Sequence, residues 1–219
     1  MAPQAFVSWS SGKDAAYALV EARRLGLAEV VGALTTVNAA FDRVAMHGVR
    51  RSVLERQVAA LGLPCLQVPL PYPCSNEVYE ARMAEACAKM KADGIRHVVF
   101  GDLFLEDIRQ YREQRLAAAG MEGIFPLWQR PTRDLAAEML DAGMVAHLAC
   151  VDSKQLDPRF SGRRWDGALL AELPAGVDPC GENGEFHTLV TAGPMFAAPI
   201  AVSAGETVTR EGFVYTDFV

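Results

Sequence analysis

The chain has 219 residues, of which 51% are hydrophobic and 22% are charged. This composition supports a packed core and excludes a disordered tail, a collagen-like rod and a coiled coil. Lys and Arg number 21 against 27 Asp and Glu, which gives a net charge of −6. Because a negative chain has no general attraction for nucleic-acid phosphates or anionic lipid, we expect neither nucleic acid nor membrane as a partner.

The cellular compartment is indicated by what the sequence lacks. Residues 1–10 have no basic start and no small-residue cleavage site of a secretory signal. The longest uncharged stretch, 188–205, contains two glycines and two prolines, which membrane helices rarely tolerate. The five cysteines form no C-x-x-C pair, which suits reduced thiols. We therefore expect a cytoplasmic protein without disulfides or structural zinc.

Strands and helices alternate along the first two thirds of the chain, judged by apolar periodicity and by helix caps and stop signals. The expected elements, beginning with a strand and alternating, are 5–9, 13–24, 30–37, 49–61, 66–68, 75–91, 97–100, 106–119, 127–128, 132–143 and 145–151. Strands that alternate with helices predict a parallel sheet covered on both faces. The fold class is therefore α/β, of the Rossmann-like kind.

The pattern changes after Asp152. Segment 153–186 is rich in Gly, Pro and Asp, with one helix-like piece at 166–173. Strands are expected at the end of the chain, at 187–191, 200–202 and 207–215. We infer a nucleotide-binding domain of residues 1–150 and a smaller C-terminal α+β domain of residues 151–219. Homo-oligomerisation stays open.

The first strand runs into Ser10-Ser-Gly-Lys-Asp14 and then into a helix. This arrangement offers backbone N–H groups and a helix N-terminus to an anion. The turn is not a Walker A loop, because Val7 stands where the first glycine belongs and Asp14 follows the lysine. A dinucleotide fingerprint is also absent, because the chain contains no G-x-G.

The turn resembles the pyrophosphate loop S-G-G-x-D-S of the ATP pyrophosphatase superfamily, in which ATP is cut between its α and β phosphates. Ser10, Gly12 and Asp14 match this pattern. Ser11 replaces the first glycine, a modest change if the backbone keeps φ negative, and Ala15 replaces a serine hydroxyl. A turn that only caps the helix is the alternative.

Further motifs follow in the same order as in one known family: Met46-His-Gly-Val-Arg50, Phe100-Gly-Asp102 with Arg109, Tyr111-Arg-Glu113, Phe125-Pro-Leu-Trp128 and Cys180-Gly-Glu-Asn-Gly-Glu-Phe-His-Thr188. The chain thereby resembles the diphthine–ammonia ligase family, in its bacterial-type branch. The resemblance implies an adenine nucleotide alpha hydrolase-like domain, a C-terminal acceptor domain, and amide formation that consumes ATP to AMP and pyrophosphate.

The late motif departs from the family pattern. Diphthine ligases show G-E-G-G-E-Y/F-E-T, whereas this chain has Asn183 in place of a glycine and His187 in place of the second glutamate. Because that motif is thought to face the acceptor, an acceptor other than diphthine is open. The expected partners are a small-molecule or protein-borne carboxylate and ammonia or an amine.

The expected ATP site combines the first turn with the ends of other strands, where parallel sheets bind ligands. Its residues are Ser10, Ser11, Gly12, Lys13, Asp14, Thr35, Gly101, Asp102 and Arg112. Asp14 and Asp102 are the expected ligands of Mg²⁺, which takes oxygen ligands shared with phosphates. A favourable helix-dipole position for Asp14 and an ordinary turn at Gly101-Asp102 are the alternatives.

Two basic segments are candidates for contacts with phosphate and substrate. Arg109, Arg112 and Glu113 share one helix face, either as an exposed ion-paired surface or with Arg109 neutralising the α-phosphate catalytically and Glu113 binding substrate. His47 and Arg50 lie at an expected helix start, where a bound anion of the substrate would offset unfavourable positive charge.

The densest ionisable cluster comprises Glu182, Glu185 and His187, the expected catalytic groups beside Arg109. On a strand, residues 185 and 187 face the same way, and Asn183 with Gly184 would contact substrate. Either carboxylate could orient or deprotonate an amine, and histidine titrates near neutral pH. A metal site lacks an obvious fourth ligand, and a polar turn is the purely structural alternative.

The leading hypothesis is an ATP-dependent, AMP-forming ligase that adenylates a carboxylate and amidates it. One alternative is an adenylating enzyme that modifies tRNA, against which the net charge and the absence of C-x-x-C count. The other is a nucleotide sensor without turnover, suggested by Ala15 in place of the loop's last serine.

Overall fold

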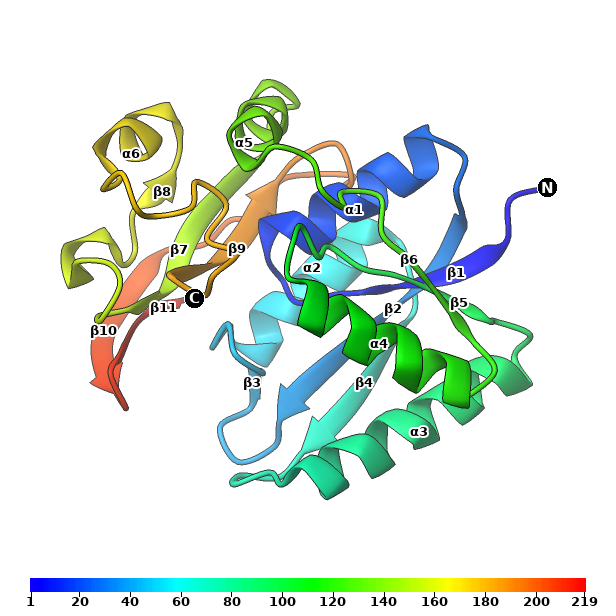
Figure 1. Cartoon of the computed structure of the whole chain (residues 1–219). Helices are drawn as coiled ribbons and strands as arrows, with labels where there is room; N and C mark the ends of the chain where they lie inside the picture. The colour runs from blue at the N-terminus through cyan, green and yellow to red at the C-terminus, as the bar shows by residue number, and fades with distance from the viewer.

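The chain forms two β-sheets, A and B, with helices between and around them (Figure 1). The computed structural model describes residues 1–219. Sheet A contains β1 (Gln4–Ser8), β2 (Glu29–Asn38), β3 (Arg43–Val44), β4 (Cys65–Leu70), β5 (His97–Val99) and β6 (Glu122–Ile124). Sheet B contains β7 (Val145–Asp152), β8 (Arg164–Trp165), β9 (Phe186–Ala192), β10 (Ala204–Arg210) and β11 (Phe213–Phe218).

The helices are α1 (Lys13–Arg24), α2 (Arg51–Leu61), α3 (Asn76–Ala92), α4 (Glu106–Ala118), α5 (Thr132–Asp141), α6 (Gly167–Glu172) and the 3-10 turn η1 (Pro158–Phe160). In Figure 1, α3 and α4 lie in front of sheet A, with α1 and α2 behind it. Helix α1 contacts both β2 and β9. No helix is long and apolar enough to cross a membrane.

Sheet A is parallel except for β3, which pairs antiparallel with the end of β2. Its parallel strands lie in the order β4-β2-β1-β5-β6. The chain therefore builds outward from β1 through β2 and β4, and then crosses to the other side for β5 and β6. In open parallel sheets, ligands bind where this direction reverses, beyond the carboxyl ends of the strands. Here that point lies between the ends of β1 and β5.

Sheet B is antiparallel, with β9 and β11 paired to β7. One hydrophobic core joins the two sheets, because Val7 of β1, Leu19 of α1 and Leu189 of β9 belong to the same buried cluster. The two sheets are therefore packed as one body around α1. Strand β7 runs through residue 150, and the division into domains 1–150 and 151–219 stays a prediction.

The predicted α/β class, with its parallel sheet and smaller C-terminal α+β part, is confirmed. Three predicted strands are wrong. Residues 127–128 form a turn after β6, whose Glu-Gly-Ile sequence carries little strand signal, and residues 200–202 form no strand. Residues 207–215 belong to the β10–β11 hairpin, in which Glu211 and Gly212 turn the chain with φ of 53° and 86°. The short strands β3 and β8 were not predicted.

Candidate functional site

The first loop, Trp9–Gly12, connects β1 to α1 at the point where sheet A reverses direction. Ser11 has a φ of 69°, a left-handed conformation that costs a non-glycine residue roughly 1–2 kcal/mol. The carbonyl of Ser11 accepts hydrogen bonds from the Val190 amide at 2.9 Å and from Gln57 Nε2 at 3.2 Å. The loop therefore keeps the conformation that glycine prefers, and the negative φ that would make the change to Ser11 a modest one is not present.

The start of α1 is poorly capped by the protein itself. Gly12 is its N-cap residue and supplies no side-chain hydrogen bond, and the buried hydroxyl of Ser11 has no partner. A Cβ at Gly12 would lie 2.6 Å from Cε1 of His47, so only glycine fits there. Thr188 Oγ1 accepts a hydrogen bond from the Lys13 amide at 3.1 Å. Donors that side chains do not cap make a helix N-terminus suited to an anion.

We predict that Ser11→Gly stabilises the protein and that Ser11→Ala does not. Glycine relieves the left-handed strain but gains chain entropy on unfolding, which leaves a net advantage of about 1 kcal/mol over alanine. Urea unfolding of both variants and the parent measures this difference. An alanine variant as stable as the glycine variant would show that residue 11 is unstrained.

The side chain of Lys13 is buried between the two sheets. Its ammonium donates to Asp14 Oδ2 at 2.9 Å and to the carbonyl of Cys180, and it lies 5.4 Å from the ring centroids of both Trp165 and Phe186. Burial alone would lower the pKa of Lys13, but the neighbouring Asp14 carboxylate holds it above the usual value. Lys13 therefore stays charged and ties α1 to the late motif, and its expected contact with phosphate stays a prediction.

We predict that Lys13→Met lowers the free energy of unfolding by about 3 kcal/mol, because removing one partner of a buried ion pair leaves the other uncompensated. The matched control is Lys89→Met on the exposed surface of α3. Urea unfolding at neutral pH should show a large effect for the first variant and a negligible one for the second. Equal effects would contradict a special role for the buried ammonium.

Two histidines meet beside the first loop. The rings of His47 and His187 lie 4.8 Å apart, and Nδ1 of His47 donates to the Thr188 carbonyl at 2.9 Å. Burial lowers the pKa of His47 to about 3 and that of His187 to about 4. Both rings are therefore neutral at physiological pH.

From the lowered pKa values of His47 and His187 we predict that the free energy of unfolding decreases in mild acid. In the unfolded chain their pKa values return to about 6.5. Below that pH these histidines are therefore protonated in the unfolded state but stay neutral in the folded state. Their contribution to the free energy of unfolding is fully present above about pH 6.5 and is lost as the pH falls towards about 4. We expect His187→Asn to reduce the stability lost between about pH 7 and pH 5 by about 2 kcal/mol.

Urea unfolding at the two pH values measures this change. Glu182, described below, has a raised pKa and acts in the opposite direction, so the comparison with the parent isolates the histidine. The control is His97→Asn at the start of β5, at the amino ends of the parallel strands and thus away from the site at their carboxyl ends. An unchanged pH dependence in the His187 variant would contradict the prediction.

The late motif, residues 178–188, is folded by its own hydrogen bonds. Asp178 Oδ2 accepts from the amides of Cys180 at 3.2 Å and Glu182 at 3.0 Å. Glu185 Oε1 accepts from the Asp178 amide at 2.9 Å and from Asn183 Nδ2 at 3.0 Å. Glu185 is 2% exposed and precedes β9. Glu185 therefore closes the loop, and unlike His187 it does not line the cleft described below. Asn183, next to Gly184, is bound to Glu185 within the motif.

Glu182 reaches out of the late motif towards sheet A. Its Oε1 accepts a hydrogen bond from the Leu103 amide at 2.7 Å, just beyond β5. Burial, with smaller contributions from the negative charges of Asp14 and Asp102, raises the pKa of Glu182 to about 7. The structure thus brings Glu182 of the late motif near the carboxylates of Asp14, at the start of α1, and Asp102, at the end of β5.

The two aspartates of this group have different surroundings. Burial raises the pKa of both Asp14 and Asp102, Asp14 Oδ1 is buried without a hydrogen-bond partner, and Arg112 Nε lies 2.8 Å from Asp102 Oδ2. A Cβ at Gly101 would lie 2.6 Å from the Asp14 carbonyl carbon. The glycine therefore lets α1 touch the end of β5. No three His, Cys, Asp or Glu side chains are arranged as a metal site.

A cleft of about 1510 Å³ opens over the carboxyl ends of β1 and β2, between α3, α4 and the β10–β11 hairpin. Of the expected site residues, Ser10, His47, Arg112 and His187 line it. Trp9 and Ser10 of the first loop are part of this lining, whereas Asp14, Asp102 and Glu182 are not. The cleft therefore borders the first loop, and the two together form the candidate site.

The other fourteen expected site residues lie outside the cleft lining, and Thr35, Arg50, Arg109 and Glu113 among them have other partners. Thr35 is 2% exposed, with Oγ1 3.6 Å from Cys65 Sγ, because alternation along β2 turns Thr36 to the cleft instead. Arg109 donates to Glu113 at 2.8 Å, as in the expected ion-paired helix face.

The other positive charge of this group, Arg50, is compensated within the chain. It donates from Nε to the Asp217 carboxylate at 2.8 Å, so β11 supplies the anion expected at the start of α2. Arg109 also stacks on two aromatic rings, with its guanidinium carbon 4.7 Å from the centroid of Phe125 and 4.6 Å from that of Trp128. Both arginines therefore stabilise the packing of their own helices.

The sequence analysis missed Gln57, which is fully buried. Its Oε1 accepts from Trp9 Nε1 at 3.1 Å, and its Nε2 donates to the carbonyl of Val190 at 2.8 Å as well as to the first loop. The available signal was a polar residue on the apolar face of α2, beside Val53 and Leu54. Gln57 is therefore a positioning residue for the first loop.

A parallel sheet with a strand–loop–helix unit where its direction reverses, whose N-cap residue Gly12 supplies no side-chain hydrogen bond, defines a Rossmann-like α/β protein with a candidate anion site. Comparison with known proteins narrows this class. Residues 131–217 match the family description "Diphthamide synthase C-terminal domain".

Similar curated proteins include the diphthine–ammonia ligases of Bos taurus, 32% identical over 48% of this chain and 42% of the relative, and Homo sapiens, 32% identical over 48% and 41%. That of Rattus norvegicus is 31% identical over 48% and 41%. The chain thus spans about two fifths of the length of these relatives. These matches support a diphthine–ammonia ligase-like family for the chain, and its bacterial-type branch stays a prediction.

Proposed function

We propose that this protein is an ATP-dependent ligase that converts a carboxylate into an amide and releases AMP and pyrophosphate. The observation that carries the proposal is the hydrogen bond from the Leu103 amide to Glu182. It joins the late motif, expected to face the acceptor, to the point where sheet A would bind a nucleotide. The names of the similar proteins, diphthine–ammonia ligases, support the same reaction class.

The first loop is suited to the phosphates of ATP. The start of α1 presents amides and the positive end of its dipole, and Ser10 adds a hydroxyl that lines the cleft. Arg112, which also lines the cleft, is placed to balance charge that develops on the α-phosphate. Pyrophosphate is then the group that leaves from the first loop.

Asp14 and Asp102 are suited to hold Mg²⁺ together with the phosphates. The buried, unpartnered Oδ1 of Asp14 is an oxygen ligand without a competing donor. Mg²⁺ commonly takes one or two protein carboxylates and completes its shell with phosphates and water. When bound, the ion would neutralise charge on the departing pyrophosphate.

The proposed reaction has two steps. A carboxylate oxygen of the acceptor attacks the α-phosphorus of ATP, and the bond to the β-phosphate oxygen breaks to release pyrophosphate. The nitrogen of ammonia or an amine then attacks the acyl carbon, AMP leaves with the C–O electron pair, and the nitrogen loses a proton. Glu182 is suited to take this proton, since a base with a pKa near 7 is half ionised at neutral pH.

The acceptor is a small-molecule or protein-borne carboxylate and need not be diphthine. His187 lines the cleft as a neutral ring where the family pattern has a glutamate. A neutral ring in place of a carboxylate removes a negative charge that would attract a cationic acceptor. Asn183 is held by Glu185 and lies outside the cleft lining.

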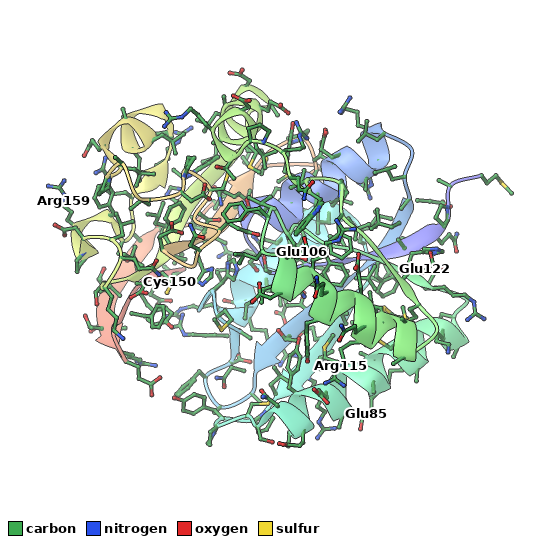
Figure 2. The ribbon with its side chains drawn as sticks, in the orientation of Figure 1. Glu85, Glu106, Arg115, Glu122, Cys150 and Arg159 are labelled. Carbon is green, nitrogen blue, oxygen red and sulfur yellow. The ribbon has the colours of Figure 1, made fainter.

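We predict that Glu182→Gln lowers the rate of AMP formation by about 10²–10⁴-fold, the usual loss when a general base is removed. The assay combines the full chain with ATP, Mg²⁺, ammonium and a pool of carboxylic acids, and scores AMP, pyrophosphate and new amides. The control is Glu122→Gln at the start of β6, labelled at the edge of the molecule in Figure 2. We expect its rate to equal that of the parent.

Other products would contradict the proposal. Release of ADP and phosphate excludes cleavage between the α and β phosphates. Tight ATP binding without AMP across the acid pool favours a nucleotide sensor. AMP formation that requires tRNA favours a tRNA-modifying enzyme, although the net charge of −6 provides no general attraction for RNA.

A further inference from the structure

The cleft is larger than one nucleotide requires. Its volume of about 1510 Å³ exceeds the range of about 300–1,000 Å³ that is usual for a single small-molecule pocket. Its lining includes the first loop and β2. It also includes Phe41 in the loop between β2 and β3, Tyr72 in the loop between β4 and α3, and the β10–β11 hairpin, which we call the outer end. More than half of its lining residues are hydrophobic. The cleft therefore has room for a second molecule with an apolar body beside the nucleotide.

The positive charges of the cleft differ in whether the chain itself neutralises them. Arg43 pairs with Asp217 at 2.8 Å, Arg112 with Asp102 at 2.8 Å, and Arg115 with Glu80. Arg210 also lines the cleft, and it makes no ion pair and no side-chain hydrogen bond. It is the cation of this lining that has no partner within the protein.

Arg210 is held at the cleft mouth by an aromatic surface. Its guanidinium carbon lies 5.5 Å from the ring centroid of Phe41, and the rings of Phe41 and Tyr72 lie 5.0 Å apart. The hydroxyl of Tyr72 donates to Glu211 Oε1 at 3.0 Å. This bond links the hairpin to Tyr72 and gives Glu211, the carboxylate next to Arg210 along the chain, a hydrogen-bond partner other than Arg210. Three segments distant in sequence therefore build the surroundings of one free guanidinium.

This arrangement selects for a negative ligand. An exposed aromatic surface can bind an ammonium group through cation–π attraction, but here the guanidinium of the protein already lies over Phe41. A second cation would be repelled. A carboxylate would form charge-assisted hydrogen bonds with two guanidinium nitrogens.

We infer that the outer cleft binds an acceptor with an apolar body and two acidic groups, one held by Arg210 and the other presented to the first loop for activation. The inference rests on the proposed function, because it assigns the second carboxylate to the reaction with ATP. Arg210 is then a specificity-determining residue, and monocarboxylates of the same length are poorer ligands.

Binding of matched acids tests this assignment directly. The probes are adipate, suberate and para-phenylenediacetate, each compared with hexanoate, octanoate or phenylacetate by titration calorimetry on the full chain. We expect at least one diacid to bind about tenfold or more tightly than its monoacid partner, as a hydrogen-bonded charge pair provides. We expect Arg210→Gln to abolish this preference.

The matched control is Arg159→Gln. The Arg159 side chain is 67% exposed and lies at the left edge of the molecule in Figure 2, on the side of sheet B. It should keep the preference for diacids. Equal binding of diacids and monoacids by the parent, binding of neither, or an unchanged preference in the Arg210 variant would each overturn the inference.

The AMP assay separates this inference from the proposed function. With a preferred diacid, Arg210→Gln should raise the KM for the acid about tenfold or more while kcat and the KM for ATP stay unchanged. If no acid yields AMP although the Arg210-dependent preference persists, the ligase proposal fails and the diacid site stands. If AMP forms with monoacids and diacids at equal KM, the ligase proposal stands and the diacid site fails.

Discussion

A buried ammonium group is the constraint on which this architecture depends. Lys13 follows the first loop directly, yet its charge lies between the sheets, where it must find compensation without water. It finds this in Asp14, in the Cys180 carbonyl and in two aromatic rings of the C-terminal half. The start of α1 and the late motif therefore hold each other in place, and neither can reach its observed geometry alone.

The same constraint explains why the carboxylates of the site have unusual proton affinities. Asp14, Asp102 and Glu182 approach one another because Lys13 draws the late motif towards α1. Burial, and to a smaller extent the negative charges of Asp14 and Asp102, raise the pKa of Glu182 to about 7. Net charge is a weak guide in such a site, because a chain with an overall charge of −6 still directs Arg112 and Arg210 into its cleft.

Local features were predictable from the sequence. The strand, turn and helix around the first loop follow from apolar periodicity and a glycine at the helix start, and the observed α1 has the predicted bounds. The short strands were missed because two or three residues carry too little periodicity. The β10–β11 turn was missed because Glu211-Gly212 is not a common hairpin pair.

Contacts between distant residues were not predictable from one sequence. The partner of Arg50 is 167 positions away, at Asp217, and nothing in the spacing of either residue indicates the other. The direction of the Lys13 side chain depends on the packing of sheet B. For the same reason, Glu182 and Glu185 looked equivalent in the motif, but one reaches the end of β5 and the other closes its own loop.

Thr188 has a consequence for how this protein can change over evolution. Its hydroxyl accepts from the Lys13 amide and its carbonyl from His47, while Val190, two positions later, donates to the first loop. A single residue inserted or deleted in β9 between Phe186 and Thr188 would turn the side chains beyond it to the other face of the strand and separate these contacts together. The length of this segment is thus fixed more strictly than its composition, and variation in the acceptor can arise there by substitution but not by insertion.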